Sequence, residues 1–137
     1  MNFKFRHINR MLYPTKHILV CEDNLDNQSA IAKHFAHLFG AEHFVQCSFV
    51  SGSLAASSIL SYCQVDLILL DHDMPHGNGT DLLSWMKNNN CKVPVITFSG
   101  IPYNNISMMQ NGANHLFGKG DIIVGEADEL IKKILEL

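Results

Sequence analysis

The chain has 137 residues, a formal net charge of −3 and 47% apolar residues, which is typical of one globular domain and not of a disordered chain. A broad nucleic-acid-binding surface is not expected, because it needs clustered Lys and Arg against the phosphates. No apolar run reaches membrane-spanning length. Four scattered cysteines without a C-x-x-C pair exclude a zinc knuckle and are typical of free thiols. We therefore expect a cytoplasmic domain with no membrane insertion and no direct contact with nucleic acid.

Residues 1–16 differ in charge from the rest of the chain. They carry four basic residues and no acidic one, whereas all 13 acidic residues lie beyond them. We expect a basic N-terminal extension over 1–16, followed by one domain over 17–137. Two alternatives stay open for the extension: a flexible segment, or one that packs on the domain or on a partner.

From residue 17 onward, short apolar runs alternate with amphipathic stretches. The runs predict strands at 17–22, 43–49, 65–71, 93–99 and 113–117. The stretches between and after them predict helices at 24–40, 53–63, 80–90, 104–112 and 125–137. Strand–helix units with short connections favour an α/β fold, in which a five-stranded, doubly wound parallel sheet is flanked by five helices.

In such a sheet the functional site lies outside the carboxyl ends of the strands. The first predicted strand ends in Glu22 and Asp23, and the third ends in Asp71. Ser99 ends the fourth strand, and Lys119 follows the fifth. Three carboxylates close together repel one another and need cations. Lys119 supplies one positive charge, and Mg²⁺ held by oxygen ligands is the natural second, with Mn²⁺ as the alternative ion.

This set of residues favours phosphoryl transfer to a carboxylate. A nucleotide-phosphate cradle is not expected, because the turn after the first strand, EDNLDN, is acidic and lacks glycine. In the remaining interpretation Asp71 is the nucleophile and forms an aspartyl phosphate. Mg²⁺, Lys119 and the Ser99 hydroxyl would then stabilise charge on the phosphoryl oxygens.

Over residues 17–137 the chain resembles the receiver domain of bacterial two-component response regulators. The resemblance rests on four motifs that stand in the family's order: ILVCEDN, DLILLDHDMPHGNG, VPVITFSG and GANHLFGK. It implies the flavodoxin-like strand order 2-1-3-4-5. It also implies a phosphohistidine donor, carried by a sensor histidine kinase or a histidine phosphotransfer protein.

The resemblance also implies a role for each site residue. Asp71 would be the phosphoacceptor, and Ser99 and Lys119 would contact the phosphoryl group. The implied Mg²⁺ ligands are Glu22, Asp23, Asp71 and the backbone carbonyl of Asp73.

Three features depart from the family pattern. Gly120 follows Lys119 where the family usually has a cis-proline, and a cis bond before another residue type costs about 3–4 kcal/mol. Either a trans peptide with a rearranged loop or a strained peptide that aims Lys119 would fit. The link to the last helix, GDIIVGEADEL, is longer than usual. Leu116 stands where the family has its aromatic switch, which puts the usual coupling to Ser99 in doubt and leaves Phe117 and His115 as substitutes.

The span from Val93 to Gly118 contains no Asp, Glu, Lys or Arg. It covers the face that receivers commonly use for output. We expect either a homodimer or a downstream protein target to dock on the 101–118 face, or else a short helix that is simply well packed. The apolar residues considered for this surface are Ile101, Ile106, Met108 and Met109. The switch and output candidates are Ser99, Ile106, Met109 and Leu116.

Other functions fit parts of the sequence. His72 and His76 beside Asp71 look like a metal cage, but a zinc site would need a further His or Cys at ligand spacing, so we expect both on the loop surface. A haloacid-dehalogenase-type phosphatase could use Asp71 as nucleophile and Asp73 as general acid, although its motifs come in a different order. A degenerate receiver that only binds partners is the third candidate. The leading hypothesis is a phosphorylatable signalling domain, not a turnover enzyme.

Overall fold

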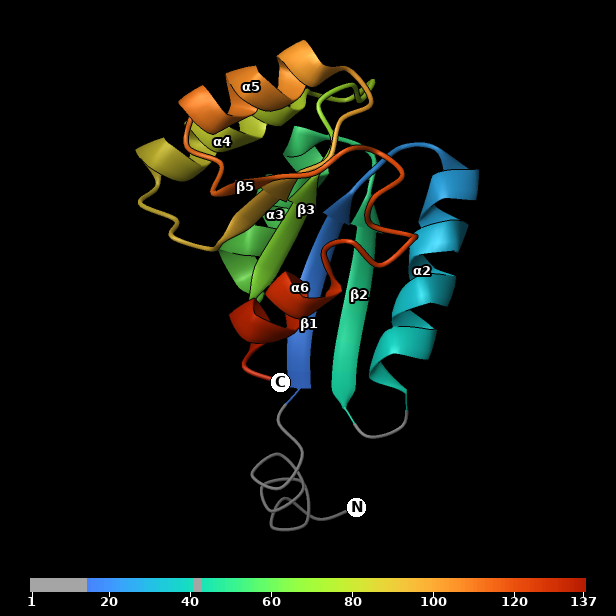
Figure 1. Ribbon diagram of the computed structural model, residues 1–137. Helices are drawn as coiled ribbons and strands as arrows, with labels where there is room; N and C mark the ends of the chain where they lie inside the picture. Colours follow the sequence, from blue (N-terminus) through green and yellow to red (C-terminus); the bar gives the residue numbers. More distant parts are fainter. Residues whose placement is uncertain (1–14, 41–42) are drawn as a thin grey trace, which may run out of the picture.

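The computed structural model describes residues 15–40 and 43–137. Across these residues five parallel strands form one sheet in the order β2-β1-β3-β4-β5, as Figure 1 shows. The strands are β1 (Thr15–Cys21), β2 (Phe44–Val50), β3 (Leu67–Leu70), β4 (Val95–Thr97) and β5 (His115–Leu116). This sheet confirms the predicted fold class and strand order.

Helices cover both faces of the sheet (Figure 1). They are α2 (Leu25–Phe39), α3 (Ser53–Tyr62), α4 (Gly79–Asn88), α5 (Pro102–Gln110) and α6 (Asp128–Leu135). α2 and α6 bury apolar residues in one core cluster, and α3, α4 and α5 bury theirs in a second cluster on the other face. The described chain is therefore a three-layer α/β structure, with one helix following each strand.

The two central strands explain why the sheet is buried on both faces. Every residue from Ile18 to Cys21 in β1 and from Leu67 to Leu70 in β3 has no exposed surface. Alternate side chains point to opposite faces of a strand, so Leu19 joins the α3–α5 cluster while Ile18 joins the α2–α6 cluster. Burying each such side chain contributes about 1.5–3 kcal/mol.

The observed strand ends differ from the predicted ones by one or two residues. β1 begins at Thr15, two residues early, because Thr15 and Lys16 pair with Phe44 and Val45 of β2. Two residues assigned to the basic extension therefore belong to the sheet, and residues 1–14 lie outside the described part of the chain. β3 and β4 stop short of Asp71 and Ser99, which places both residues in the loops beyond the strand ends.

The last helix begins at Asp128, three residues later than predicted. Residues 119–127 form successive turns instead, and Gly125 has a φ of +87°, a left-handed conformation that an α-helix does not contain. Within this link Ile122 is fully buried against the α2–α6 cluster. The Nε2 atom of His34 on α2 lies 2.7 Å from Oδ1 of Asp128, so α6 is tied to α2 at its first residue.

No helix in the described part of the chain is long and apolar enough to cross a membrane.

Ile122 should anchor the long link to the core. Ile122→Ala removes buried methyl groups and should lower the free energy of unfolding by about 2–5 kcal/mol. Ile123 next to it is 41% exposed, so Ile123→Ala is the matched control and should change stability by no more than about 0.5 kcal/mol. Urea unfolding of both variants gives the comparison, and equal losses would show that the link is not anchored at residue 122.

Candidate functional site

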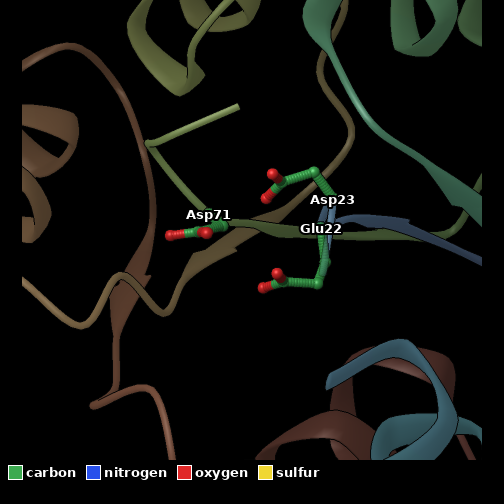
Figure 2. A group of neighbouring side chains, drawn as sticks. All are labelled: Glu22, Asp23 and Asp71. Carbon is green, nitrogen blue, oxygen red and sulfur yellow. The ribbon is translucent and has the colours of Figure 1, made fainter. Parts of the chain in front are cut away.

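Three carboxylates meet at the carboxyl ends of β1 and β3. Glu22 and Asp23 follow β1, and Asp71 follows β3, which pairs with β1 through Cys21 and Leu70. The side chains of the three residues lie together at these strand ends (Figure 2). One carboxylate oxygen from each lies within 4.8 Å of the others. Glu22 and Asp71 are buried, with 1% and 4% of their surface exposed, while Asp23 is exposed. Two carboxylates of the acidic group are thus shielded from solvent, and the third is accessible to it.

Lys119 supplies the positive charge that this group needs. Its Nζ donates to Oε2 of Glu22 at 2.5 Å and to Oδ2 of Asp71 at 2.6 Å. The same Nζ lies 5.2 Å from the ring centroid of Phe98, a distance at which an ammonium is attracted to the ring face. One ammonium therefore bridges the ends of two neighbouring strands.

The loop that carries Lys119 follows the first of the two predicted alternatives. The Lys119–Gly120 peptide is trans, as are the other peptides in the described part of the chain. Asp121 closes the turn, because its Oδ2 accepts a hydrogen bond from the Gly118 amide at 2.7 Å while its own amide donates to the Gly118 carbonyl at 3.1 Å. Hydrogen bonds thus fix the backbone where the family usually has proline.

Burial and pairing shift the ionisation of this pair. Burial raises the pKa of Asp71 above its usual range, and the Glu22 charge adds to the rise, although the Lys119 hydrogen bond and charge act in the opposite direction. Burial lowers the pKa of Lys119, but its hydrogen bonds and charge interactions with Asp71 and Glu22 outweigh burial, and the pKa is raised overall. Lys119 is therefore charged at neutral pH.

The start of α2 holds Glu22 in place. Oε1 of Glu22 accepts hydrogen bonds from the Asn24 amide at 3.0 Å and from Nδ2 of Asn27 at 3.4 Å. Asn24 also caps α2, because its Oδ1 accepts from the Asn27 amide at 2.9 Å. The helix cap and the buried carboxylate of Glu22 thus form one hydrogen-bonded unit. Asp23 takes part in none of these hydrogen bonds.

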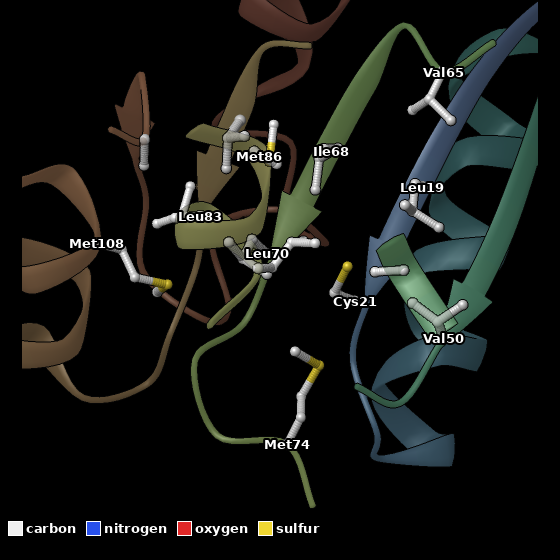
Figure 3. Packing of buried hydrophobic residues seen from close by; sticks show 14 residues of the cluster. Leu19, Cys21, Val50, Val65, Ile68, Leu70, Met74, Leu83, Met86 and Met108 are labelled. Atoms are coloured by element: carbon white, nitrogen blue, oxygen red, sulfur yellow. The ribbon is translucent and has the colours of Figure 1, made fainter. Parts of the chain in front are cut away.

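The loop after Asp71 is held against the core at several points. The His72 amide donates to Oδ1 of Asp71 at 2.9 Å. Met74 is buried and points back toward Cys21 and Leu70 (Figure 3). Gly79 allows a close approach, since a Cβ there would lie 2.5 Å from Sδ of Met108 and 3.0 Å from the Asp71 carbonyl. The methionine and the last glycine of the motif therefore hold the loop against the core.

The histidines of this loop lie outside the acidic group. In the described residues the one group of at least three potential ligands is Glu22, Asp23 and Asp71. His72 instead pairs through Nδ1 with Oδ1 of Asp73 at 3.0 Å, and His76 is exposed. The zinc cage is therefore not supported. A set of three carboxylates with one ammonium fits a hard divalent ion such as Mg²⁺.

Comparison with protein families agrees with this geometry. The model of the response regulator receiver domain matches residues 18–134. The chain belongs to the response regulator receiver family. Receiver domains are signalling domains of two-component systems, and they bind Mg²⁺ in their acidic site. Comparison with curated proteins gives no significant match.

Solved receiver structures share the fold at low sequence identity. The phosphorylated cyanobacterial phytochrome response regulator RcpA is 22% identical, with a TM-score of 0.71 over 89% of this chain and 92% of that one. A receiver domain of a Pseudomonas aeruginosa sensor histidine kinase, with magnesium coordinated in its active-site cleft, is 20% identical, with a TM-score of 0.75 over 90% and 99%. The receiver domain of a Syntrophus aciditrophicus histidine kinase is 26% identical, with a TM-score of 0.69 over 88% and 90%.

The remaining site candidates of this receiver lie around β4 and β5. Ser99 is buried, and its Oγ accepts a hydrogen bond from the Ile101 amide at 3.2 Å. Leu116 is 44% exposed on β5. Phe117 is partly buried and packs against the α2–α6 cluster.

The predicted apolar surface needs one correction. Met108 was placed on it with Met109, but Met108 is fully buried in the α3–α5 cluster and Met109 is half-buried. The sequence could not show this, because α5 is short and has no charged residues to mark which of its faces is exposed. The exposed apolar residues of the 101–118 face are Ile101, Tyr103, Ile106 and Leu116.

Sequence reasoning missed Asn105. Its side chain is 3% exposed and bonds to Ser99 and Phe117, on the loops that lead to the site. No signal in the sequence indicated it, because Met108 three residues later was itself predicted on the surface and this helix has no charged residue to mark its outward face.

Removing the ammonium should raise the pKa of Asp71 further. In Lys119→Ala the carboxylate loses the hydrogen bond and the charge that lower its pKa, while burial and the Glu22 charge remain. The Asp71 carboxyl can be followed by ¹³C NMR titration in the presence of a chelator. Lys133→Ala, an exposed lysine on α6, is the control and should leave the titration unchanged. A lower Asp71 pKa in Lys119→Ala would contradict the electrostatic account.

The raised Asp71 pKa also predicts a pH dependence of stability. Folded Asp71 holds its proton to a higher pH than the unfolded chain does. The metal-free protein should therefore lose unfolding free energy as the pH rises from the unfolded Asp pKa, about 4, through the folded one. Asp71→Asn should lack that loss, which urea unfolding at a series of pH values would measure.

Proposed function

We propose that this receiver accepts a phosphoryl group on Asp71 from a phosphohistidine and signals through protein contacts of its phosphorylated form. The observation that carries the proposal is the Lys119 ammonium held between the buried carboxylates of Glu22 and Asp71. That arrangement supplies a nucleophile and a cation in one partly buried site. The donor would be a sensor histidine kinase or a histidine phosphotransfer protein.

The transfer step uses the Asp71 carboxylate as nucleophile. One of its oxygens forms a bond to phosphorus while the phosphorus–nitrogen bond of the donor breaks, and the bonding electron pair leaves with the imidazole nitrogen. The His72 amide, 2.9 Å from Oδ1, orients the carboxylate before the reaction. A fixed carboxylate does not need to lose rotational freedom when the donor arrives.

Two side chains would stabilise the transferred group. Lys119 contacts Asp71 directly, so its ammonium can donate to a phosphoryl oxygen on that residue. Ser99 accepts from the Ile101 amide, which leaves the hydroxyl hydrogen for a phosphoryl oxygen. Donors aimed at developing charge account for much of the catalysis in this chemistry.

The acidic group would hold the divalent ion of the reaction. Glu22, Asp23, Asp71 and the Asp73 backbone carbonyl are the proposed ligands, with Mn²⁺ as the alternative to Mg²⁺. When bound, the ion would offset the negative charge that a phosphoryl group adds beside three carboxylates. The exposed Asp23 would leave room for water on the ion, which suits Mg²⁺.

Asp73 distinguishes this proposal from the phosphatase alternative. A haloacid-dehalogenase-type enzyme would need Asp73 as a general acid next to Asp71. The Asp73 side chain is 61% exposed and bonds to His72 and to Nδ2 of Asn104 on α5. The intact acidic group with Lys119 likewise argues against a receiver that only binds partners. We propose a signalling domain without turnover of external substrates, acting in the cytoplasm.

Phosphorylation of Asp71 can be tested directly. Incubation with Mg²⁺ and acetyl phosphate should add one phosphoryl group, visible in the intact mass and lost in base. Asp71→Asn should abolish the adduct, whereas Asp73→Asn, the matched control two residues away, should retain it. Multiple-turnover hydrolysis of phosphate esters that Asp73→Asn removes would support the phosphatase instead, and an adduct that forms in chelator would exclude the role of the metal.

The 101–118 face is the proposed output surface, used by a homodimer or a downstream protein. Tyr103 is 76% exposed, Ile106 52% and Leu116 44%, and the span contains no Asp, Glu, Lys or Arg. An apolar surface of this kind is typical of protein contacts. Its position on α5 and β5 places it beside the loop that carries Ser99.

Dimerisation through this face predicts a specific effect of charge. Sedimentation should show a dimer when Mg²⁺ and beryllofluoride, a mimic of the acyl phosphate, are added. Ile106→Glu should keep the protein monomeric, because a buried unpaired carboxylate costs several kcal/mol. Gln110→Glu, an exposed position on the same helix, should still dimerise. A wild-type protein that stays monomeric would argue against a homodimer and for a separate target.

A further inference from the structure

A single asparagine on α5 joins the loops of Ser99 and Lys119. Asn105 is 3% exposed, and its carboxamide makes four hydrogen bonds. Oδ1 accepts from Oγ1 of Thr97 at 2.5 Å and from the Ser99 amide at 2.7 Å. Nδ2 donates to the Ser99 carbonyl at 2.9 Å and to the Phe117 carbonyl at 3.1 Å. The side chain thereby uses its whole hydrogen-bonding capacity.

Asn105 lies where the β4–β5 ladder opens. The last ladder pair is Thr97 with Leu116, and the Phe117 amide donates to the Thr97 carbonyl at 2.9 Å. If the parallel ladder continued, the Ser99 amide would donate to the Phe117 carbonyl. The Asn105 carboxamide takes both positions instead, accepting from the first group and donating to the second. It therefore acts as a spacer between two strands.

The spacer connects the site with the proposed output face. Both backbone groups of Ser99 bond to Asn105, so a movement of Ser99 toward a phosphoryl oxygen must either carry the carboxamide along or break its bonds. Ile106, the next residue on α5, is half exposed on that face. The Phe117 carbonyl lies two residues before Lys119. The Asn105 carboxamide is thus hydrogen-bonded to the segments that carry Ser99 and Lys119, the two residues that would contact the phosphoryl oxygens.

We propose that Asn105 is a positioning residue that sets the place of Ser99 and transmits its movement to α5. It would take over the coupling that the family assigns to an aromatic residue and that Leu116 cannot provide. This inference rests on the proposed phosphorylation of Asp71. Asn105 acts through Ser99 and Phe117 and touches none of the reacting atoms.

The coupling can be followed by amide NMR while beryllofluoride and Mg²⁺ are added. In the wild-type protein the amide signals of His72, Ser99 and Ile106 should all shift. In Asn105→Ala the His72 signal should still shift, whereas the Ile106 shift should fall to less than half. Phosphorylation by acetyl phosphate should slow roughly tenfold, because Ser99 is no longer fixed. Asn111→Ala is the control, since that asparagine caps the C-terminus of α5 and its side chain donates to the Ser107 carbonyl of the same helix at 2.7 Å.

Each outcome separates the two proposals. A wild-type protein whose His72 signal does not respond would refute the phosphoacceptor function. A normal His72 response together with an unchanged Ile106 response in Asn105→Ala would overturn the role of Asn105 alone.

A measurement on the wild-type protein covers the case in which Asn105→Ala does not fold. The two Nδ2 protons of Asn105 donate to the Ser99 and Phe117 carbonyls, so their NMR signals should be slow to exchange and should shift together with Ser99. If the Ser99 amide moves and these side-chain signals stay in place, the carboxamide does not follow Ser99 and the inference is wrong.

Discussion

The structure depends on one electrostatic constraint, the need to balance negative charge at the carboxyl ends of β1 and β3. Glu22 and Asp71 are both nearly inaccessible to solvent, and two buried carboxylates so close together repel each other. The Lys119 ammonium touches both. It does so from a loop about fifty residues beyond Asp71, and the order of the sheet brings that loop to the same edge. The sheet topology thus brings the Lys119 ammonium into contact with the carboxylates of Glu22 and Asp71.

Much of this arrangement could be predicted from the sequence, because apolar runs that end in polar residues are visible without coordinates. The runs before Glu22 and Asp71 are continuous, as central parallel strands require. Convergence of parallel strand ends then brings Glu22, Asp71 and Lys119 together without knowledge of side-chain positions. These three side chains lie in contact, as the strand order predicts. Their roles in phosphoryl transfer are proposals.

What could not be predicted depends on contacts that a linear pattern does not contain. Helix periodicity extended the last helix to residue 125, but Gly125 adopts a left-handed conformation and the buried Ile122 draws the preceding link inward. Met108 has the composition of a surface candidate, yet it fills space beside Gly79, where the absence of a Cβ lets its sulfur approach the Asp71 loop. Asn105 lies on an uncharged helix whose inward face the sequence does not reveal, and its four partner groups come from two separate segments, Thr97 to Ser99 and Phe117.

Two of the three departures from the family pattern are compensated in the same way, by hydrogen bonds. Where the family usually has proline after the lysine, Asp121 holds the turn through hydrogen bonds to Gly118. Where it has an aromatic switch, Asn105 supplies a hydrogen-bonded spacer. Proline and an aromatic ring act through shape, whereas a carboxylate and a carboxamide act through directional bonds that are costly to leave unmade when buried. A movement of Ser99 would therefore not leave α5 unaffected, because the buried amide must keep its partners or lose them together.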